Sequence, residues 1–184
     1  MTRFFDILFS FIGLVTLSPI FILIIIIGYI DTGSPIFRQE RVGLSKKPFR
    51  LIKFRSMKLN APSVATHLAS ASLITSFGHF LRKSKLDELP QLWNVFVGDM
   101  SLVGPRPNLF NQEELIDERD SRGVYSVRPG ITGLAQINRI DMSTPQLLAK
   151  TDAKMIGKQN TLEYFKYVFI TVFGKGFGDS IKNE

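Results

Sequence analysis

The chain has 184 residues, 45% of them apolar, and 23 Lys and Arg against 16 Asp and Glu give a formal net charge of +7. This length suits one ordinary domain with a short additional segment. Because the sequence contains no cysteine, a disulfide framework and thiolate chemistry are excluded.

The N-terminal segment is strongly apolar: residues 7–30 carry no charge and include the run PIFILIIII at 19–27. About 24 residues in one straight helix extend roughly 36 Å, enough to cross a hydrocarbon core of about 30 Å. A cleaved signal peptide is the alternative, but this stretch is too long and the following YIDTGSP lacks a small-x-small cleavage site. We therefore predict a membrane-anchoring element over residues 1–30.

Ser18 and Pro19 interrupt this segment near its middle. Proline removes a backbone donor and clashes with the preceding turn, so the helix must bend or break there, and the Ser18 hydroxyl is suited to bond a freed carbonyl. Two topologies remain open. The helix either spans the bilayer, or forms two half-helices that enter and leave the same leaflet; the residues alone favour spanning, because kinked spanning helices are common.

Residues 31–184 have the composition of one globular domain. Residues 35–43 and 48–55 predict two short strands around a basic turn, and residues 59–72 predict a surface loop. Eight basic residues lie between Arg38 and Lys58, with Glu40 the single acid. Such a cluster marks the cytoplasmic side of a membrane, where it can lie on anionic headgroups. Nucleic-acid binding is the competing use, which the neighbouring apolar segment disfavours.

Helical patterns occupy much of the rest of the chain. We predict a helix from residue 73 to the basic residues 82–85, a second helix beginning between Ser84 and Asp87, and a charged, exposed helix over 111–122. Residues 98–108 predict a loop and 129–133 a turn. The apolar face from Leu162 to Phe173 predicts either a last core helix, the preferred interpretation, or an amphipathic helix lying in the interface. The fold class is α/β, mostly helical with short strands.

Adjacent carboxylates at Asp87 and Glu88 are the first candidate for chemistry, since a zinc site, a GxGxxG loop and a Walker A loop are missing from the sequence. Neighbours on a helix point about 100° apart, but they can divide two tasks. One can attack phosphorus while the other holds Mg²⁺. The alternative is structural: Ser84-x-x-Asp87 also fits a capping box, and spacing alone favours capping.

Arg106 is the second candidate, because the prolines on both sides restrict its backbone and suit it to bidentate phosphate binding. A tight turn with an exposed arginine explains the same residues. The third candidate is 129–133, whose amides could form an anion nest, although a plain turn is the simpler interpretation.

Four motifs in this order resemble the bacterial sugar transferase family, the monotopic phosphoglycosyl transferases that initiate surface glycan assembly. They are KFRSM (53–57), LDELPQLWN (86–94), GDMSLVGPRP (98–107) and RPGITG (128–133). The resemblance runs from about residue 4 to the C-terminus. It implies that residues 1–30 form a re-entrant helix-break-helix turned at Ser18 and Pro19, which replaces the spanning topology. Residues 31–184 would be a cytoplasmic catalytic domain with interface-lying amphipathic helices, at the bacterial inner membrane.

The resemblance also implies a two-step reaction. Asp87 would attack the sugar-linked phosphate of a UDP-sugar, releasing UMP, and polyprenyl (undecaprenyl) phosphate would then accept the phosphosugar. Glu88, with Asp87, would bind Mg²⁺. Arg82 and Arg106 match phosphate-binding arginines, and Lys53 and Arg55 are carried over as phosphate or headgroup contacts. We expect an N-acetylated donor sugar and membrane lipids, but no nucleic acid, as partners; the oligomeric state is not readable from the sequence. A non-catalytic, membrane-anchored scaffold that binds anionic lipid is the alternative function.

Overall fold

The computed structural model describes residues 2–61 and 71–173 of the chain. The helices are α1 (Thr2–Thr16), α2 (Ser18–Thr32), α3 (Ser76–Ser84), α4 (Gln91–Val97), α5 (Glu113–Asp120), α6 (Leu134–Ile137), α7 (Pro145–Lys158) and α8 (Thr161–Val172). The strands are β1 (Ile36–Val42), β2 (Pro48–Phe54), β3 (Ser101–Val103) and β4 (Gly130–Thr132), and 3₁₀ turns η1 (Leu44–Lys46), η3 (Ala71–Leu73), η4 (Leu86–Glu88) and η5 (Val124–Ser126) lie between them. The predicted α/β class, mostly helical with short strands, is confirmed.

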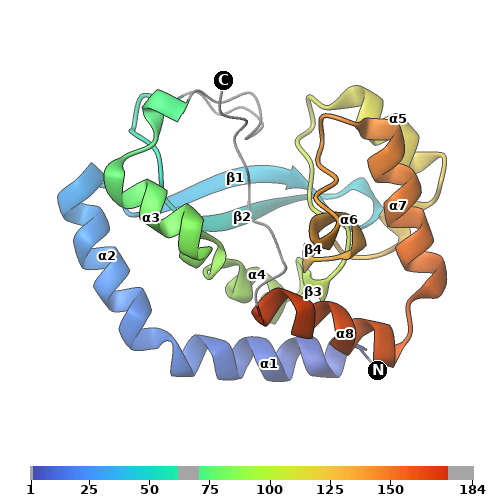
Figure 1. The fold of residues 1–184 in the computed structure, drawn as a ribbon, viewed down its shortest axis with the longest axis horizontal. Coiled ribbons are helices and arrows are strands. Elements are labelled where there is room, and N and C mark those ends of the chain that lie inside the picture. Colours follow the sequence, from blue (N-terminus) through green and yellow to red (C-terminus); the bar gives the residue numbers. More distant parts are fainter. Residues whose placement is uncertain (1, 62–70, 174–184) are drawn as a thin grey trace.

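The helices α1 and α2 run along two sides of the molecule, as Figure 1 shows. The antiparallel pair β1 and β2 crosses the middle, α3 and α4 lie between it and α1, and α5 and α7 form the opposite side (Figure 1). One core cluster centres on β3, α4 and α8, and a smaller one joins α2, β2 and α3.

The break at Ser18 and Pro19 is confirmed. The axes of α1 and α2 differ by 61°, and the Ser18 hydroxyl donates to the Val15 carbonyl at 2.8 Å, as expected for a carbonyl near a proline break. Within the described residues no single helix is long and apolar enough to cross a membrane, whereas α1 and α2 together reach that length and composition across their bend.

A buried aspartate of α1, Asp6, ties this helix to the globular part of the chain. Asp6 is 2% exposed, and its Oδ1 accepts from the Ser101 hydroxyl at 3.0 Å, the Leu102 amide at 2.9 Å and the Tyr164 hydroxyl at 2.8 Å. Burial, together with the adjacent Asp6 carboxylate, raises the pKa of Tyr164, so its hydroxyl remains a donor. The predicted anchoring element therefore begins with a half that is also part of the folded core.

We expect Asp6→Ala to destabilise the protein by on the order of 3 kcal/mol, because three buried donors lose a charged acceptor. For a chain of this size that corresponds to a fall of about 10 °C in the midpoint of thermal unfolding. The measurement is thermal unfolding of the detergent-solubilised chain, with Asp117→Ala, a change at an exposed position of α5, as the matched control. Equal midpoints for the two variants would show that Asp6 does not hold α1 in place.

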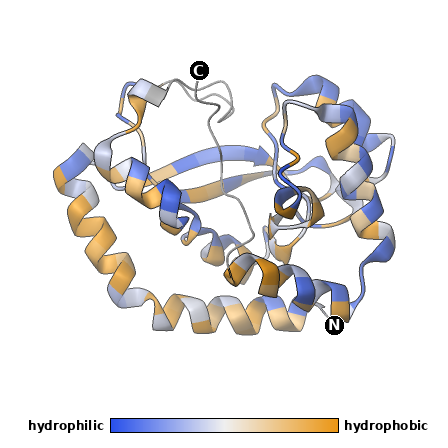
Figure 2. Cartoon of the chain, viewed as in Figure 1, coloured by the Kyte–Doolittle hydropathy of each residue, from blue (hydrophilic) through white to orange (hydrophobic). Residues whose placement is uncertain are grey.

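Large apolar side chains remain exposed along α1, α2 and α8, and Figure 2 shows the continuous hydrophobic colouring of α1 and α2. We call this set the apolar surface. It comprises Phe4, Ile7, Leu8, Phe11, Ile12, Val15, Ile20, Ile22, Leu23, Ile26, Tyr29, Ile30, Leu162, Phe169, Val172 and Phe173. An exposed set of this extent marks an interaction surface rather than ordinary surface variation.

The helix α8 fits both interpretations of its apolar face, a core helix and an amphipathic helix in the interface, each in part. Tyr164 and Tyr167 are buried in the main core, whereas Leu162 is 82% and Val172 is 70% exposed. The predicted stripe contained Phe165 and Val168, which pack against this core, but it left out the two tyrosines at its centre, because tyrosine has a polar hydroxyl as well as an apolar ring. One face of α8 thus belongs to the core and the other to the apolar surface.

The predicted hairpin is confirmed, with Ile36 opposite Phe54 and Val42 opposite Pro48. The predicted loop over 98–108 and turn over 129–133 are wrong in part, because each contains a short strand, β3 and β4, paired in parallel. These strands come so close that a Cβ on Gly130 would lie 2.0 Å from the amide nitrogen of Gly104. Three residues of strand between glycines and prolines are too short to show an alternating pattern.

Three helix predictions need correction. The second helix does not begin between Ser84 and Asp87: α4 begins at Gln91, after the 3₁₀ turn η4. The charged helix is Glu113–Asp120, and it is not exposed throughout, because Leu115 and Arg119 are buried. We predicted no element over 134–158, where α6 and α7 lie. Of the predicted surface loop 59–72, residues 62–70 lie outside the described residues.

Candidate active site

Asp87 and Glu88 lie in η4, between α3 and α4. Lys85, with a left-handed φ of 58°, ends α3 and turns the chain, and Pro90 is the N-cap of α4, a position where its missing N–H costs nothing. Both carboxylates are buried, at 6% and 9% exposure. Buried carboxylates need compensating partners, which distinguishes this pair from surface acids.

The capping-box interpretation is wrong. The Ser84 hydroxyl donates backwards to the carbonyls of Phe80 and Leu81, at 2.7 and 3.2 Å. The residue before η4 is Lys85 rather than Ser84, and no side chain caps this turn. The dyad is held by the chain reversal at Lys85, not by a serine cap.

The Glu88 carboxylate is contacted by two basic side chains. Its Oε1 accepts from Arg106 Nη2 at 2.6 Å, and Lys53 Nζ lies 3.9 Å from the same oxygen. Lys53 comes from β2 and Arg106 from the loop after β3, so two segments that are distant in the sequence converge on the carboxylate of η4. Such convergence fits a site that handles phosphate charge.

Arg82 lies at the end of α3, beside the segment that follows β2. Its Nε donates to the Ser56 hydroxyl at 2.8 Å, and its buried Nη1 has no hydrogen-bond partner among the described residues. Gly78, one turn earlier, lets α3 approach this closely, since a Cβ there would lie 1.9 Å from the Ser56 carbonyl oxygen. A buried guanidinium nitrogen with an open donor is suited to bind an anion.

Arg55 is engaged away from the dyad. Its Nε donates to the Ser34 carbonyl at 2.8 Å, and its guanidinium lies over the Phe37 ring, 5.5 Å from the centroid. It therefore joins the end of β2 to the segment before β1. Of the six predicted site residues, Lys53, Glu88 and Arg106 are in one cluster, Asp87 is in the same turn as Glu88, and Arg82 and Arg55 contact other partners.

Sequence reasoning missed Arg119 and Asp152, which form a buried ion pair behind the Arg106 loop. Arg119 Nη2 and Asp152 Oδ2 are 2.7 Å apart, and both side chains are at most 1% exposed. Burial raises the pKa of Asp152, although Arg119 opposes the shift. One sequence feature could have indicated this pair. Arg119 and Asp152 lie on the helix faces that otherwise present Leu115, Leu148 and Met155 to the core.

The carboxylates of this site fit Mg²⁺ only when a substrate is present to supply further ligands. Across residues 2–61 and 71–173, no group of three or more His, Cys, Asp or Glu side chains could hold a metal ion. Mg²⁺ commonly binds one or two carboxylates, with substrate phosphates and water completing its shell. Asp87 and Glu88 meet that minimum.

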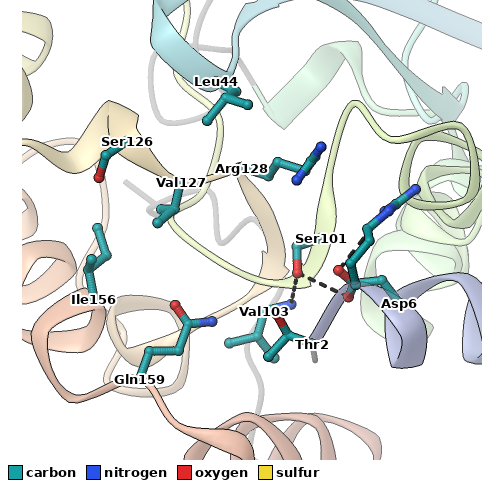
Figure 3. Close-up of a pocket in the computed structure, with 11 residues that line it drawn as sticks. Thr2, Asp6, Leu44, Ser101, Val103, Ser126, Val127, Arg128, Ile156 and Gln159 are labelled. Carbon is teal, nitrogen blue, oxygen red and sulfur yellow. Dashed lines mark hydrogen bonds and ion pairs between the residues drawn. The ribbon is translucent and has the colours of Figure 1, made fainter.

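A separate cavity of about 450 Å³ lies between the start of α1, β3, η5 and the end of α7 (Figure 3). Its lining includes Asp6, Ser101 and Arg128 but neither member of the dyad. Arg128 Nε donates to the Gly98 carbonyl at 2.8 Å, and Arg3 Nη1 donates to the Val95 carbonyl at 2.7 Å. These two cations cap the C-terminal carbonyls of α4, where positive charge is favourable, so they stabilise the helix that follows the dyad.

A family model for bacterial sugar transferases matches residues 1–176. A protein of Bacillus subtilis named uncharacterized sugar transferase EpsL is 43% identical over 139 residues, covering 75% of this chain and 68% of EpsL. The UDP-glucose:undecaprenyl-phosphate glucose-1-phosphate transferase of Escherichia coli is 39% identical over 184 residues, covering 94% of this chain and 39% of that enzyme. The exopolysaccharide production protein ExoY of Sinorhizobium fredii is 36% identical over 160 residues, covering 77% and 70%.

These matches define an enzyme of the sugar-phosphate transferase class, with the buried dyad of η4 inside the matched region. The chain belongs to the bacterial sugar transferase family. It spans about two fifths of the length of the Escherichia coli enzyme.

Proposed function

We propose that this protein transfers a phosphosugar from a UDP-sugar to a polyprenyl phosphate, undecaprenyl phosphate in the bacterial membrane, and releases UMP. The observation that carries the proposal is the buried Asp87–Glu88 turn with Arg106 and Lys53 on the Glu88 carboxylate. The name of the Escherichia coli relative, a transferase of glucose 1-phosphate to undecaprenyl phosphate, supports the same reaction class. Such a transfer is a first membrane step in polysaccharide biosynthesis, to which the name of the ExoY relative also refers.

The reaction proceeds in two displacements. A carboxylate oxygen of Asp87 attacks the phosphorus bonded to the sugar, an Asp–O–P bond forms, and the bond to the UMP oxygen breaks, so UMP leaves. A phosphate oxygen of the polyprenyl phosphate then attacks the same phosphorus and regenerates the Asp87 carboxylate. Splitting one displacement in two is the advantage of a covalent nucleophile.

The surrounding cations lower the cost of bringing two phosphorylated substrates to a carboxylate. Arg82 directs its open Nη1 donor at a phosphate oxygen, and Arg106, held by Glu88, and Lys53 offset the charge that develops on the transferring group. Asp87 and Glu88 would hold Mg²⁺, which would supply further charge neutralisation on the phosphates. Arg55 hydrogen-bonds the backbone close to the membrane or binds a lipid headgroup.

The apolar surface supports the location that we propose for this site, the cytoplasmic face of the inner membrane. In this arrangement α1 and α2 form the re-entrant element, residues 1–30, in one leaflet, and the exposed face of α8 lies in the interface beside them. The catalytic domain, residues 31–184, then meets the water-soluble donor on one side and the acceptor phosphate at headgroup depth on the other. The long lipid chain never has to leave the bilayer.

The topology can be tested with Thr2→Cys, because the chain has no native cysteine. We expect an impermeant thiol reagent to label this variant only after the cells are permeabilised, since a re-entrant helix keeps residue 2 in the cytoplasm. A cysteine at exposed Glu114 of α5 is the cytoplasmic control. Labelling of residue 2 in intact cells would mean that the segment spans the bilayer.

The reaction is tested by incubating membranes that contain the protein with Mg²⁺, undecaprenyl phosphate and a panel of UDP-sugars. We expect UMP release that depends on the acceptor and is lost with EDTA, and we expect the best donor to carry an N-acetylated sugar. UDP-glucose and UDP-galactose belong in the panel, since relatives are named for these sugars. If no donor yields UMP, the catalytic proposal fails and a non-catalytic scaffold that binds anionic lipid replaces it.

A further inference from the structure

The loop that presents Arg106 has every backbone carbonyl from residue 104 to 108 engaged. The Gly104 and Pro105 carbonyls accept from Gln136 Nε2 and the Gly130 amide. Those of residues 106, 107 and 108 accept from Arg119 Nη1, Arg41 Nη1 and the Val42 amide. A loop fixed at five successive carbonyls has little freedom to move the side chain it presents.

Within this loop the prolines before and after Arg106 contribute no N–H. The segment therefore has few donors of its own with which to form a stable turn, and it depends on donors from elsewhere. Two of those donors are buried guanidinium groups, of Arg41 and Arg119, which are 5% and 1% exposed. An arginine buried that completely costs several kcal/mol of desolvation unless it is fully paired, so its position here needs a reason.

Arg119 is the donor that contacts residue 106 itself. Its Nη1 donates to the Arg106 carbonyl at 2.9 Å and to Asn108 Oδ1 at 2.8 Å. Its Nε and Nη2 both donate to Asp152 Oδ2, at 3.1 and 2.7 Å. Asp152, from α7, thus fixes one edge of the guanidinium, and the other edge fixes the backbone from which Arg106 reaches Glu88.

We propose that Arg119, oriented by Asp152, is a positioning residue for the transfer reaction. It holds the Arg106 backbone so that the Arg106 guanidinium stays on Glu88, 2.6 Å from Oε1. This inference rests on the proposed function, because it assigns a role within the same site. Arg119 touches neither member of the dyad and acts only through Arg106.

The test uses the paired substitution Arg119→Met with Asp152→Leu, so that no unpaired charge remains buried. We expect the variant to keep a thermal midpoint near that of the parent, and its kcat for UMP release to fall by about 10²-fold, the scale of a 1 Å misplacement. The KM for the UDP-sugar should change far less. Arg122→Met, at an exposed position just after the same helix and paired with Glu118, is the matched control and should retain parental activity.

A double-mutant cycle separates positioning from general support of the fold. Arg106→Ala itself lowers kcat. In that background we expect the paired substitution to lower kcat by less than a further threefold. The same 10²-fold loss in both backgrounds, or no loss in the parent, would overturn the inference. Should the paired variant not fold, Arg119→Lys answers the same question, since an ammonium cannot reach Asp152, Asn108 and the Arg106 carbonyl together.

The outcomes also separate this inference from the proposed function. Absence of UMP release by the parent protein with every donor would defeat the function. If the parent is active and the effects of the substitutions on kcat are additive in the cycle, only the role of Arg119 is refuted. The proposed reaction then stands.

Discussion

Asp87→Asn is expected to abolish turnover while leaving the fold intact. The substitution keeps the size of the side chain in the buried η4 turn and removes the anionic oxygen that attacks phosphorus. Loss of a covalent nucleophile costs about 10⁴-fold or more in kcat in well-studied enzymes. UMP release in the presence of donor, acceptor and Mg²⁺ should therefore fall to background, with the thermal midpoint within a few degrees of the parent.

Asp99→Asn is the matched control for this variant. Asp99 lies just after α4 and accepts a hydrogen bond from Asn94 at 3.2 Å, so the same chemical change is made close to the site but outside it. It should retain near-parental turnover. Full activity of Asp87→Asn would show that Asp87 is not the nucleophile and would contradict the covalent mechanism.

Glu88→Gln is expected to lower kcat by about 10²-fold and to raise the Mg²⁺ concentration needed for half-maximal activity. The reason is geometric and electrostatic together. Glu88 orients Arg106 and neutralises Lys53, and a neutral amide leaves both cations less well compensated in a buried site. A carboxylate is also a far better Mg²⁺ ligand than an amide.

The measurement is a Mg²⁺ titration of UMP release for the parent, Glu88→Gln and Glu114→Gln, the last being an exposed change on α5. A fall in kcat with no change in the Mg²⁺ requirement would assign Glu88 to Arg106 positioning alone. Unchanged kcat and unchanged Mg²⁺ requirement would exclude both roles.

The sequence predicted those parts of the fold in which local signals are strong. Pro19 forces a break in the uncharged segment 7–30, and the β1 and β2 segments flank a basic turn, so the break and the hairpin were confirmed. Parallel pairing of β3 with β4 could not be predicted, because it joins residues about 30 apart through glycines in close contact. The strand propensity of single residues carries no information on such long-range pairs.

The site was predicted in part. The family resemblance assigned Glu88, Arg106 and Lys53 to one site. In the structure these three side chains lie together, and their roles stay predictions. The same segment suggested a helix N-terminus at Asp87 that is instead a 3₁₀ turn. Arg119 and Asp152 were missed, since charged residues in a charged helix are ordinarily solvated, and only packing shows that this pair is buried. Buried ion pairs of this kind lie outside the reach of local sequence patterns.

The most direct test is the mass of the intact protein after brief incubation with UDP-sugar and Mg²⁺ but no polyprenyl phosphate. We expect one equivalent of UMP per chain at most, and a mass increase equal to one sugar phosphate, located on the peptide that contains Asp87. Formation of lipid-linked product by a protein whose residue 87 never carries that mass would contradict the covalent mechanism.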